Sequence, residues 1–124
     1  MTQPNVDRIF SVADDLSFRH ETLALFRFQA ERCEPYRQYL DLIGVAADEV
    51  CEVEQIPFLP IGLFKTHNIY CGEGQPEQIF TSSSTGGSVP SRHLMADLSI
   101  YERAFRGAFR NFYGFKILFT RQTL

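Results

Sequence analysis

Tryptophan is absent from the 124-residue sequence, and its three cysteines include no C-x-x-C pair. An odd number of cysteines without that spacing argues against a disulfide framework and against a zinc site. No stretch approaches the roughly 18 apolar residues of a membrane-spanning helix. The polar N-terminus also lacks the apolar core of a signal peptide. We therefore expect three reduced cysteines that serve as small, buried apolar residues, no metal site, no membrane span and a cytoplasmic protein.

The overall amino-acid composition is typical of a globular protein. Hydrophobic residues make up 44% of the chain and charged residues 22%, which is a typical balance for a folded domain. Twelve phenylalanines and five tyrosines supply the aromatic side chains, and each buried ring contributes about 1.5 to 3 kcal/mol to stability. We expect a single domain over residues 1–124.

Acidic and basic side chains are unevenly distributed along the chain. Residues 1–90 carry six basic and thirteen acidic side chains, whereas residues 91–124 carry six basic and two acidic ones. A positively charged segment favours a nearby anion. An ordinary amphipathic helix with a solvated face explains its arginines better than nucleic-acid binding does, so no nucleic-acid partner is predicted.

Helical periodicity characterises residues 1–50. Apolar side chains recur at helical spacing between Phe18 and Ile43, as expected for a stripe that packs into a core. Pro35 interrupts this pattern because proline removes a helical hydrogen bond and collides with the preceding turn. The pattern predicts two helices, or one helix broken at Pro35, with Gly44 as the stop signal.

Residues 51–70 form a proline-rich connection. Pro57 and Pro60 exclude a regular helix across this part of the chain, and we expect an extended, buried segment instead. Lys65 and His67 are two residues apart, which places them on the same side of a strand. Taken by themselves, an exposed lysine and a structural histidine are the simpler interpretation.

A segment rich in hydroxyl groups and glycine follows. Residues 81–91 read Thr-Ser-Ser-Ser-Thr-Gly-Gly-Ser-Val-Pro-Ser, between a predicted short strand at 78–80 and a helix that Asp97 caps. Small residues let the backbone approach an anion, glycine accepts positive φ, and hydroxyl groups add donors. An ordinary flexible loop is the alternative. The predicted phosphate-binding residues are Thr81, Ser82, Ser83, Ser84, Thr85, Gly86 and Gly87.

The remaining chain predicts a helix followed by a strand. Gly114 is expected to end the helix, and Phe115–Leu118 is apolar enough for a strand. With the strand at 78–80, these elements predict a short βαβ-like segment over residues 78–124 and an α/β fold. Apolar side chains of the helix recur at steps of three and four residues, at Leu98, Tyr101, Phe105, Phe109 and Phe112.

Two stretches together resemble the acyl-protein synthetase (LuxE-type) family of the adenylate-forming, phenylacetate-CoA ligase-like superfamily. The first, residues 56–67, reads Ile-Pro-Phe-Leu-Pro-Ile-Gly-Leu-Phe-Lys-Thr-His. The second, residues 80–93, reads Phe-Thr-Ser-Ser-Ser-Thr-Gly-Gly-Ser-Val-Pro-Ser-Arg-His and is followed by Asp97 and Tyr101. Family members have a similar Phe-Lys-x-His segment, then a Thr/Ser-Ser-Gly-Thr-Thr-Gly loop, then a helix with an Asp near its start. The resemblance runs from about residue 18 to residue 116.

The resemblance implies the incomplete N-terminal part of an adenylate-forming large domain. It implies ATP- and Mg²⁺-dependent activation of a fatty or other carboxylic acid as an acyl-adenylate, followed by transfer to a protein thiol or another acceptor. It further implies that residues 81–87 contact the β- and γ-phosphates, with Lys65, His67 and Asp97 in support, and that an acyl-CoA reductase-like protein is a partner. No catalytic residue or metal ligand is assigned, and the chain alone is expected to be inactive.

The loop departs from the family pattern at two positions. Ser83 stands where the family has glycine, and Ser84 where it has threonine. Because serine lacks the freedom of glycine at positive φ, the departure favours an alternative hypothesis. The chain would then be a non-catalytic binding or assembly module with a structural loop, docking through its terminal strand by edge addition.

Overall fold

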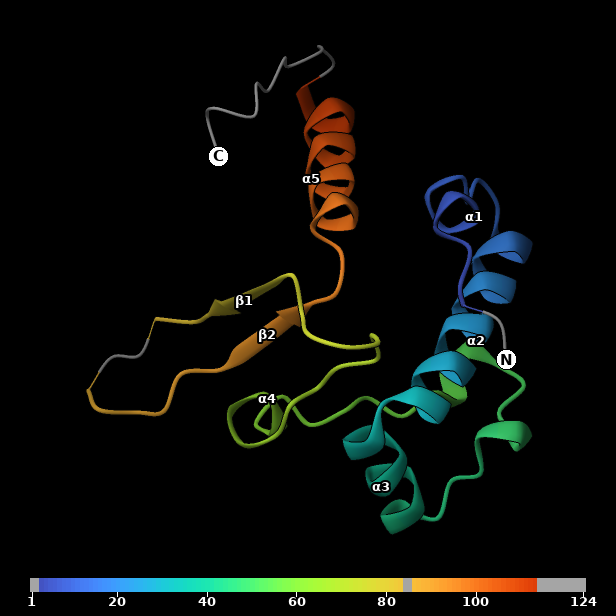
Figure 1. The fold of residues 1–124 in the computed structure, drawn as a ribbon. Helices are drawn as coiled ribbons and strands as arrows, with labels where there is room; N and C mark the ends of the chain where they lie inside the picture. The colour runs from blue at the N-terminus through green and yellow to red at the C-terminus, as the bar shows by residue number, and fades with distance from the viewer. Residues whose placement is uncertain (1–2, 84–85, 114–124) are drawn as a thin grey trace.

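The computed structural model describes residues 3–83 and 86–113 (Figure 1). The described chain is 54% helical and contains a two-stranded antiparallel sheet, which confirms a mixed, helix-rich class. None of the helices described is long and apolar enough to cross a membrane. The elements are α1 (Val6–Phe10), α2 (Asp15–Arg32), α3 (Glu34–Ile43), the 3₁₀ turns η1 (Ala47–Glu49) and η2 (Val53–Gln55), α4 (Leu63–Thr66), β1 (Gln78–Thr81), β2 (Arg92–Met95) and α5 (Leu98–Tyr113).

Helices α2 and α3 meet at Cys33, as the interruption at Pro35 predicts. A capping box starts α2, because the Asp14 carboxylate accepts the backbone N–H of Ser17 at 2.7 Å and satisfies a donor that the first helical turn leaves unpaired. Hydrogen bonds from Ser17 also lower the pKa of Asp14. Pro35 lies in the first turn of α3, where proline is tolerated. Gly44 ends α3 with φ at 74°, which confirms the predicted stop.

The hydrophobic core lies where α2, α3 and the segment after α3 meet. Phe26 and Tyr36 make the central aromatic contact, an edge-to-face pair with ring centroids 6.0 Å apart. Five of the six buried side chains belong to the predicted helical stripe, whereas Ile43, also predicted for it, is 44% exposed. The buried side chains of the described chain are Phe26, Ala30, Cys33, Tyr36, Leu40 and Val50.

Tyr36 anchors the proline-rich connection to α3, because its hydroxyl donates to the carbonyl of Pro57 at 2.6 Å. Tyr36→Phe is expected to lower the free energy of unfolding by about 1 to 2 kcal/mol, since the variant loses this bond and leaves a carbonyl without its donor. Urea denaturation measures the change. Tyr39→Phe on the same helix is the control and should change the free energy by less than about 0.5 kcal/mol. Equal losses in both variants would contradict the anchoring role of Tyr36.

The proline-rich connection is irregular where the prolines predict it to be, but it is not buried. Phe58 is 90% exposed and Ile61 83% exposed, so the expectation of a buried segment is wrong. The expectation of a strand at Lys65 is also wrong, because Lys65 lies in the helical turn α4. Proline restricts the residues before it more than those after it, and the chain therefore turns into a helix soon after Pro60.

Strands β1 and β2 form an antiparallel hairpin. Gln78 pairs with Met95 and Thr81 with Arg92. The predicted strand at 78–80 is confirmed, whereas the expectation that the hydroxyl-rich segment leads directly into a helix is wrong, because it leads into β2. Hydrogen bonding across the hairpin, rather than local alternation, defines this second strand. The predicted helix stop at Gly114 and the predicted strand at 115–118 lie outside the described residues.

Helix α5 begins after Asp97, as predicted. The Asp97 carboxylate accepts the Ser99 hydroxyl at 2.6 Å and the Ser99 backbone N–H at 2.9 Å, and these bonds lower the pKa of Asp97. The Glu77 carboxylate accepts the backbone N–H of Leu98 at 3.0 Å. Because Glu77 directly precedes β1, this second cap joins the start of the helix to the start of the hairpin.

Aromatic and ionic contacts attach α5 to the hairpin and to α1. The Tyr101 ring lies 5.3 Å from the Phe80 ring of β1, centroid to centroid. The Arg103 guanidinium lies 4.4 Å from the centroid of the Phe10 ring and 2.7 Å from the Asp7 carboxylate. The Arg103 contacts connect α5 to α1, which lies more than ninety residues earlier in the sequence.

The three cysteines are all free thiols, but they differ in burial. We expected each of them to be a small buried apolar residue. Cys33 confirms this expectation, Cys71 is half-buried, and Cys51 is exposed. Cys51 lies in the connection between η1 and η2, away from the apolar stripe of the helices, which explains why its side chain is not covered.

Candidate functional site

The two stretches that carry the family resemblance lie against each other. Helix α4 packs on β2, and the Phe64 ring stacks on the His93 imidazole with centroids 5.1 Å apart and planes inclined by 27°. Arg92 donates to the side-chain oxygen of Asn68 at 3.2 Å. Figure 1 shows α4 next to the hairpin. The structure thus brings the Phe-Lys-x-His segment to the base of the hydroxyl-rich loop.

The loop is closed at its base by a ring of hydrogen bonds. The Ser82 backbone N–H donates to the Ser91 carbonyl at 3.0 Å, and the Ser91 backbone N–H donates to the Ser82 hydroxyl oxygen at 2.9 Å. The Ser91 hydroxyl shares a hydrogen bond of 3.1 Å with His93 Nε2. Contacts from Ser82, Ser91 and His93 therefore hold the loop on the face of β2 that α4 covers.

The tip of the loop has the backbone conformation expected of its glycines. Gly86 and Gly87 have φ values of 71° and 81°, as predicted. Two adjacent residues at positive φ are typical of tight hairpin turns, and glycine adopts this conformation without steric cost. A side chain at either position would meet no other atom within 4 Å, so the backbone conformation alone requires glycine. Ser84 and Thr85 lie outside the described residues.

The segments on either side of the loop, and the segment that packs on β2, contain basic but no acidic residues. Residues 56–69 and 78–95 contain no Asp or Glu, but they contain Lys65, His67, Arg92 and His93. The Lys65, His67 and Arg92 side chains are exposed, and His67 Nδ1 bonds the Thr66 hydroxyl at 2.8 Å. Basic side chains next to exposed backbone and hydroxyl groups favour an anion.

The predicted site residues are only partly brought together. Thr81 ends β1, whereas Ser82, Ser83, Gly86 and Gly87 belong to the loop and are exposed. Lys65 and His67 lie on and next to α4, the helix that packs on β2. Asp97 lies beyond the opposite end of β2 and caps α5. The structure therefore gives Asp97 a structural role away from the loop.

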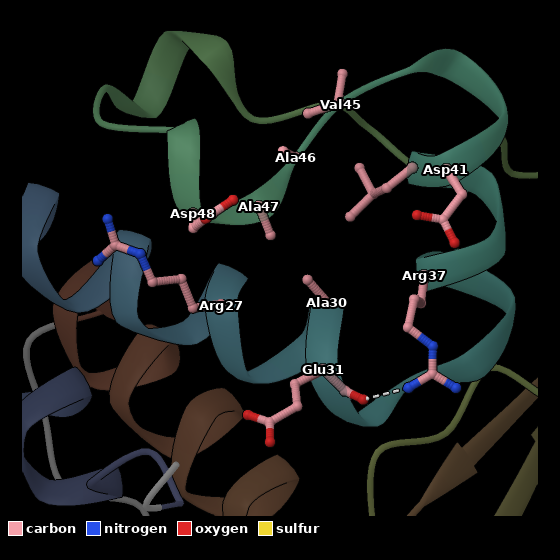
Figure 2. Close-up of a pocket in the computed structure, with 10 residues that line it drawn as sticks. Arg27, Ala30, Glu31, Arg37, Asp41, Val45, Ala46, Ala47 and Asp48 are labelled. Atoms are coloured by element: carbon pink, nitrogen blue, oxygen red, sulfur yellow. Dashed lines mark hydrogen bonds between the residues drawn. The ribbon is translucent and has the colours of Figure 1, made fainter.

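A cavity of about 580 Å³ lies between α2, α3 and the segment after α3 (Figure 2). Its floor is apolar, and five charged side chains surround it. Arg27 donates to the Val50 carbonyl at 3.1 Å, and Arg37 donates to the Glu31 carbonyl at 3.0 Å, so both guanidinium groups bind the protein's own backbone. No motif in the sequence predicts this cavity, and its polar contacts serve to hold the chain around the core.

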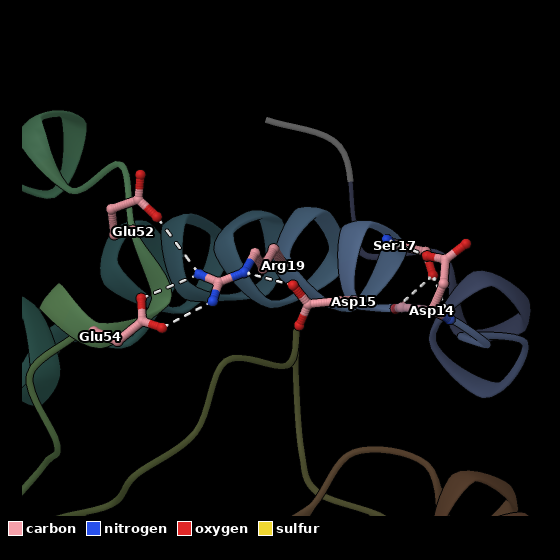
Figure 3. Close-up of polar contacts among 6 residues, drawn as sticks. All are labelled: Asp14, Asp15, Ser17, Arg19, Glu52 and Glu54. Atoms are coloured by element: carbon pink, nitrogen blue, oxygen red, sulfur yellow. Dashed lines mark hydrogen bonds and ion pairs between the residues drawn. The ribbon is translucent and has the colours of Figure 1, made fainter.

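Arg19 is the centre of an ion-pair cluster on the outside of α2 (Figure 3). It lies 3.0 Å from Asp15, 2.9 Å from Glu54 and 3.5 Å from Glu52. The hydrogen bond from Arg19 lowers the pKa of Glu54, and hydrogen bonds to Glu54 and Asp15 raise the pKa of Arg19. Because three carboxylates outnumber one guanidinium, the cluster repels anions and serves to attach η2 to α2.

Comparisons with known proteins identify no relative whose residue roles could be assigned to these residues. The chain matches no protein-family model, no curated protein and no solved structure. Within residues 3–83 and 86–113, no group of three or more His, Cys, Asp or Glu side chains is arranged to hold a metal ion. The hairpin loop with the basic residues around it in sequence is the candidate site, and its exposed hydroxyl and backbone groups favour an anion as ligand.

Proposed function

We propose that the chain is the N-terminal portion of an acyl-protein synthetase-like, adenylate-forming ligase, and that its loop binds the phosphates of ATP. The packing of α4 on β2 supports this proposal, because the contact of Phe64 with His93 joins the Phe-Lys-x-His segment to the strand that follows the loop. Positive φ at Gly86 and Gly87 and the absence of acidic residues around the loop support it. Under this proposal, residues 81–87 contact the β- and γ-phosphates.

The proposed reaction joins a fatty or other carboxylic acid to the α-phosphate of ATP and releases pyrophosphate. Backbone N–H and hydroxyl donors in the loop would neutralise charge as pyrophosphate departs, and they would hold the α-phosphorus in position for attack by the carboxylate. Mg²⁺ usually retains several waters and binds phosphate oxygens, so it would be held chiefly by the nucleotide. The acyl group would then pass to a protein thiol or another acceptor, with an acyl-CoA reductase-like protein as partner.

Amide hydrogen exchange tests phosphate binding directly. ATP with Mg²⁺, and pyrophosphate alone, are expected to slow exchange in residues 81–91, because the bound phosphates would engage the loop N–H groups. AMP is the control ligand, and it should protect these amides far less because it lacks the β- and γ-phosphates. Unchanged exchange in this segment with all three compounds would contradict the proposal.

A second candidate function is a non-catalytic binding or assembly module. The observation that favours it is the exposure of large apolar side chains outside the loop, above all Phe58 at 90% and Phe112 at 86%. A pyrophosphate-exchange assay with ATP and fatty acids separates the proposals at the level of chemistry. We expect the 124-residue chain to bind the phosphates of ATP but not to catalyse pyrophosphate exchange. Pyrophosphate exchange by this chain would show that it contains a complete ligase site. Failure to bind ATP or pyrophosphate would favour the binding or assembly module.

A further inference from the structure

Cys33 and Cys71 line the same cavity, although 37 residues lie between them in the sequence. Cys33 lies between α2 and α3 and is buried, and Cys71 packs against the core cluster to which Cys33 belongs. The two thiols are close enough that each shifts the pKa of the other. The preceding residue, Arg32, lies 3.4 Å from the Glu73 carboxylate, so two adjacent cross-connections hold these segments together.

The surroundings of the two cysteines favour the reactive thiolate form of Cys33. Its sulfur lies at the N-terminus of α3, where backbone N–H groups favour a thiolate. The hydrogen bond from Cys71 lowers the pKa of Cys33 to about 6 and raises that of Cys71. Both residues line a cavity of about 320 Å³ whose other walls are largely apolar. A small neutral oxidant could enter this cavity.

We propose that Cys33 and Cys71 are a peroxide-sensitive pair that closes to a reversible disulfide. The Cys33 thiolate attacks hydrogen peroxide, so that an S–O bond forms, the O–O bond breaks, and the departing hydroxide takes a proton to become water. The Cys71 sulfur then attacks the sulfenic acid at Cys33, forming the S–S bond and breaking the S–O bond, and the second hydroxide leaves with the Cys71 proton as water. The two sulfurs lose two electrons, which the peroxide gains.

The disulfide would bind the junction of α2 and α3 covalently to the segment that leads into the β1–β2 hairpin. In the reduced chain, the contacts between these segments are the thiol pair, the Arg32–Glu73 ion pair and neighbouring apolar side chains. A dithiol reductant would restore the free thiols by exchange. This modification is independent of the proposed phosphate binding, because neither cysteine belongs to the loop.

Mass spectrometry of the full chain tests the pairing. The reduced chain is treated with hydrogen peroxide, denatured and alkylated with iodoacetamide. We expect the loss of two hydrogens, one alkylated cysteine instead of three, a peptide that links Cys33 to Cys71, and reversal by dithiothreitol. Alkylation of both Cys33 and Cys71 after peroxide treatment would overturn the proposal, as would a disulfide that includes Cys51.

Variants identify the attacking sulfur and provide a matched control. Cys51→Ser removes the exposed thiol outside the pair and should form the same disulfide at the same rate. Cys71→Ser should stop at the sulfenic acid, which dimedone labels on Cys33. In the folded chain at pH 7, Cys33 should react with peroxide faster than Cys51, because the pKa of Cys33 is lowered and the thiolate is the reactive form. Faster labelling of Cys51 than of Cys33 would exclude Cys33 as the peroxide-sensitive thiol.

Discussion

Replacement of Phe26 by alanine is expected to lower the free energy of unfolding by about 3 to 5 kcal/mol. Phe26 is 3% exposed and makes the edge-to-face contact with Tyr36 at the centre of the core. Only five other hydrophobic side chains are buried in the described chain, so few neighbours can move to fill the cavity. Domains of this kind have total stabilities of about 5 to 15 kcal/mol, and the loss would remove a large share of that stability.

Urea denaturation followed by circular dichroism measures the effect of Phe26→Ala. Phe18→Ala is the matched control, because Phe18 lies on the same helix but is 50% exposed, and its loss should be about 1 kcal/mol or less. Phe26→Leu keeps most of the buried volume and should retain most of the stability. A Phe26→Ala variant no less stable than Phe18→Ala would show that the core is organised around other side chains.

The helical half of the fold could be predicted because its signals are local. A helix depends on contacts between residues three or four apart, so the apolar stripe, Pro35 and Gly44 were sufficient to predict the helical region, its interruption at Pro35 and the end of α3, but not the start of α2. The same holds for Asp97, which bonds a residue two positions later. Each of these predictions concerns groups that are neighbours in the sequence.

The second half could be predicted only in part, because its elements are short and their contacts are not local. The four residues of β2 read Arg-His-Leu-Met, and they form a strand because β1 pairs with them across the loop. Helix α4 also has four residues, too few for a periodic pattern. Without β2 and α4, the sequence could not predict the packing of the Phe-Lys-x-His segment on the strand that follows the loop.

The candidate site also combines features that are local in the sequence with contacts that are not. Positive φ at Gly86 and Gly87 follows from the residue type, and it was predicted. The contact of His93 with Phe64 and the contact of Cys33 with Cys71 join residues 29 and 38 positions apart, and no spacing rule indicates either of them. The predicted supporting role of Asp97 near the phosphates is not favoured, because its carboxylate caps α5.

Replacement of Gly87 by valine is expected to weaken the binding of pyrophosphate and ATP at least tenfold, equivalent to about 1.4 kcal/mol. Gly87 has φ at 81°, and a β-branched residue there is strongly disfavoured. Because no atom lies near the position of the added side chain, the strain would be relieved by a change in the loop backbone. That change would redirect the N–H groups proposed to contact phosphate, while the core would remain intact.

Gly74→Val is the matched control for this prediction. Gly74 also has positive φ, at 71°, and open space around it, but it lies outside the loop. The two substitutions introduce similar backbone strain, so a difference in affinity measured by calorimetric titration reports on the loop alone. Loss of binding only in Gly87→Val would support a phosphate site at the hairpin tip, whereas equal affinity in both variants would place any phosphate contact elsewhere on the chain.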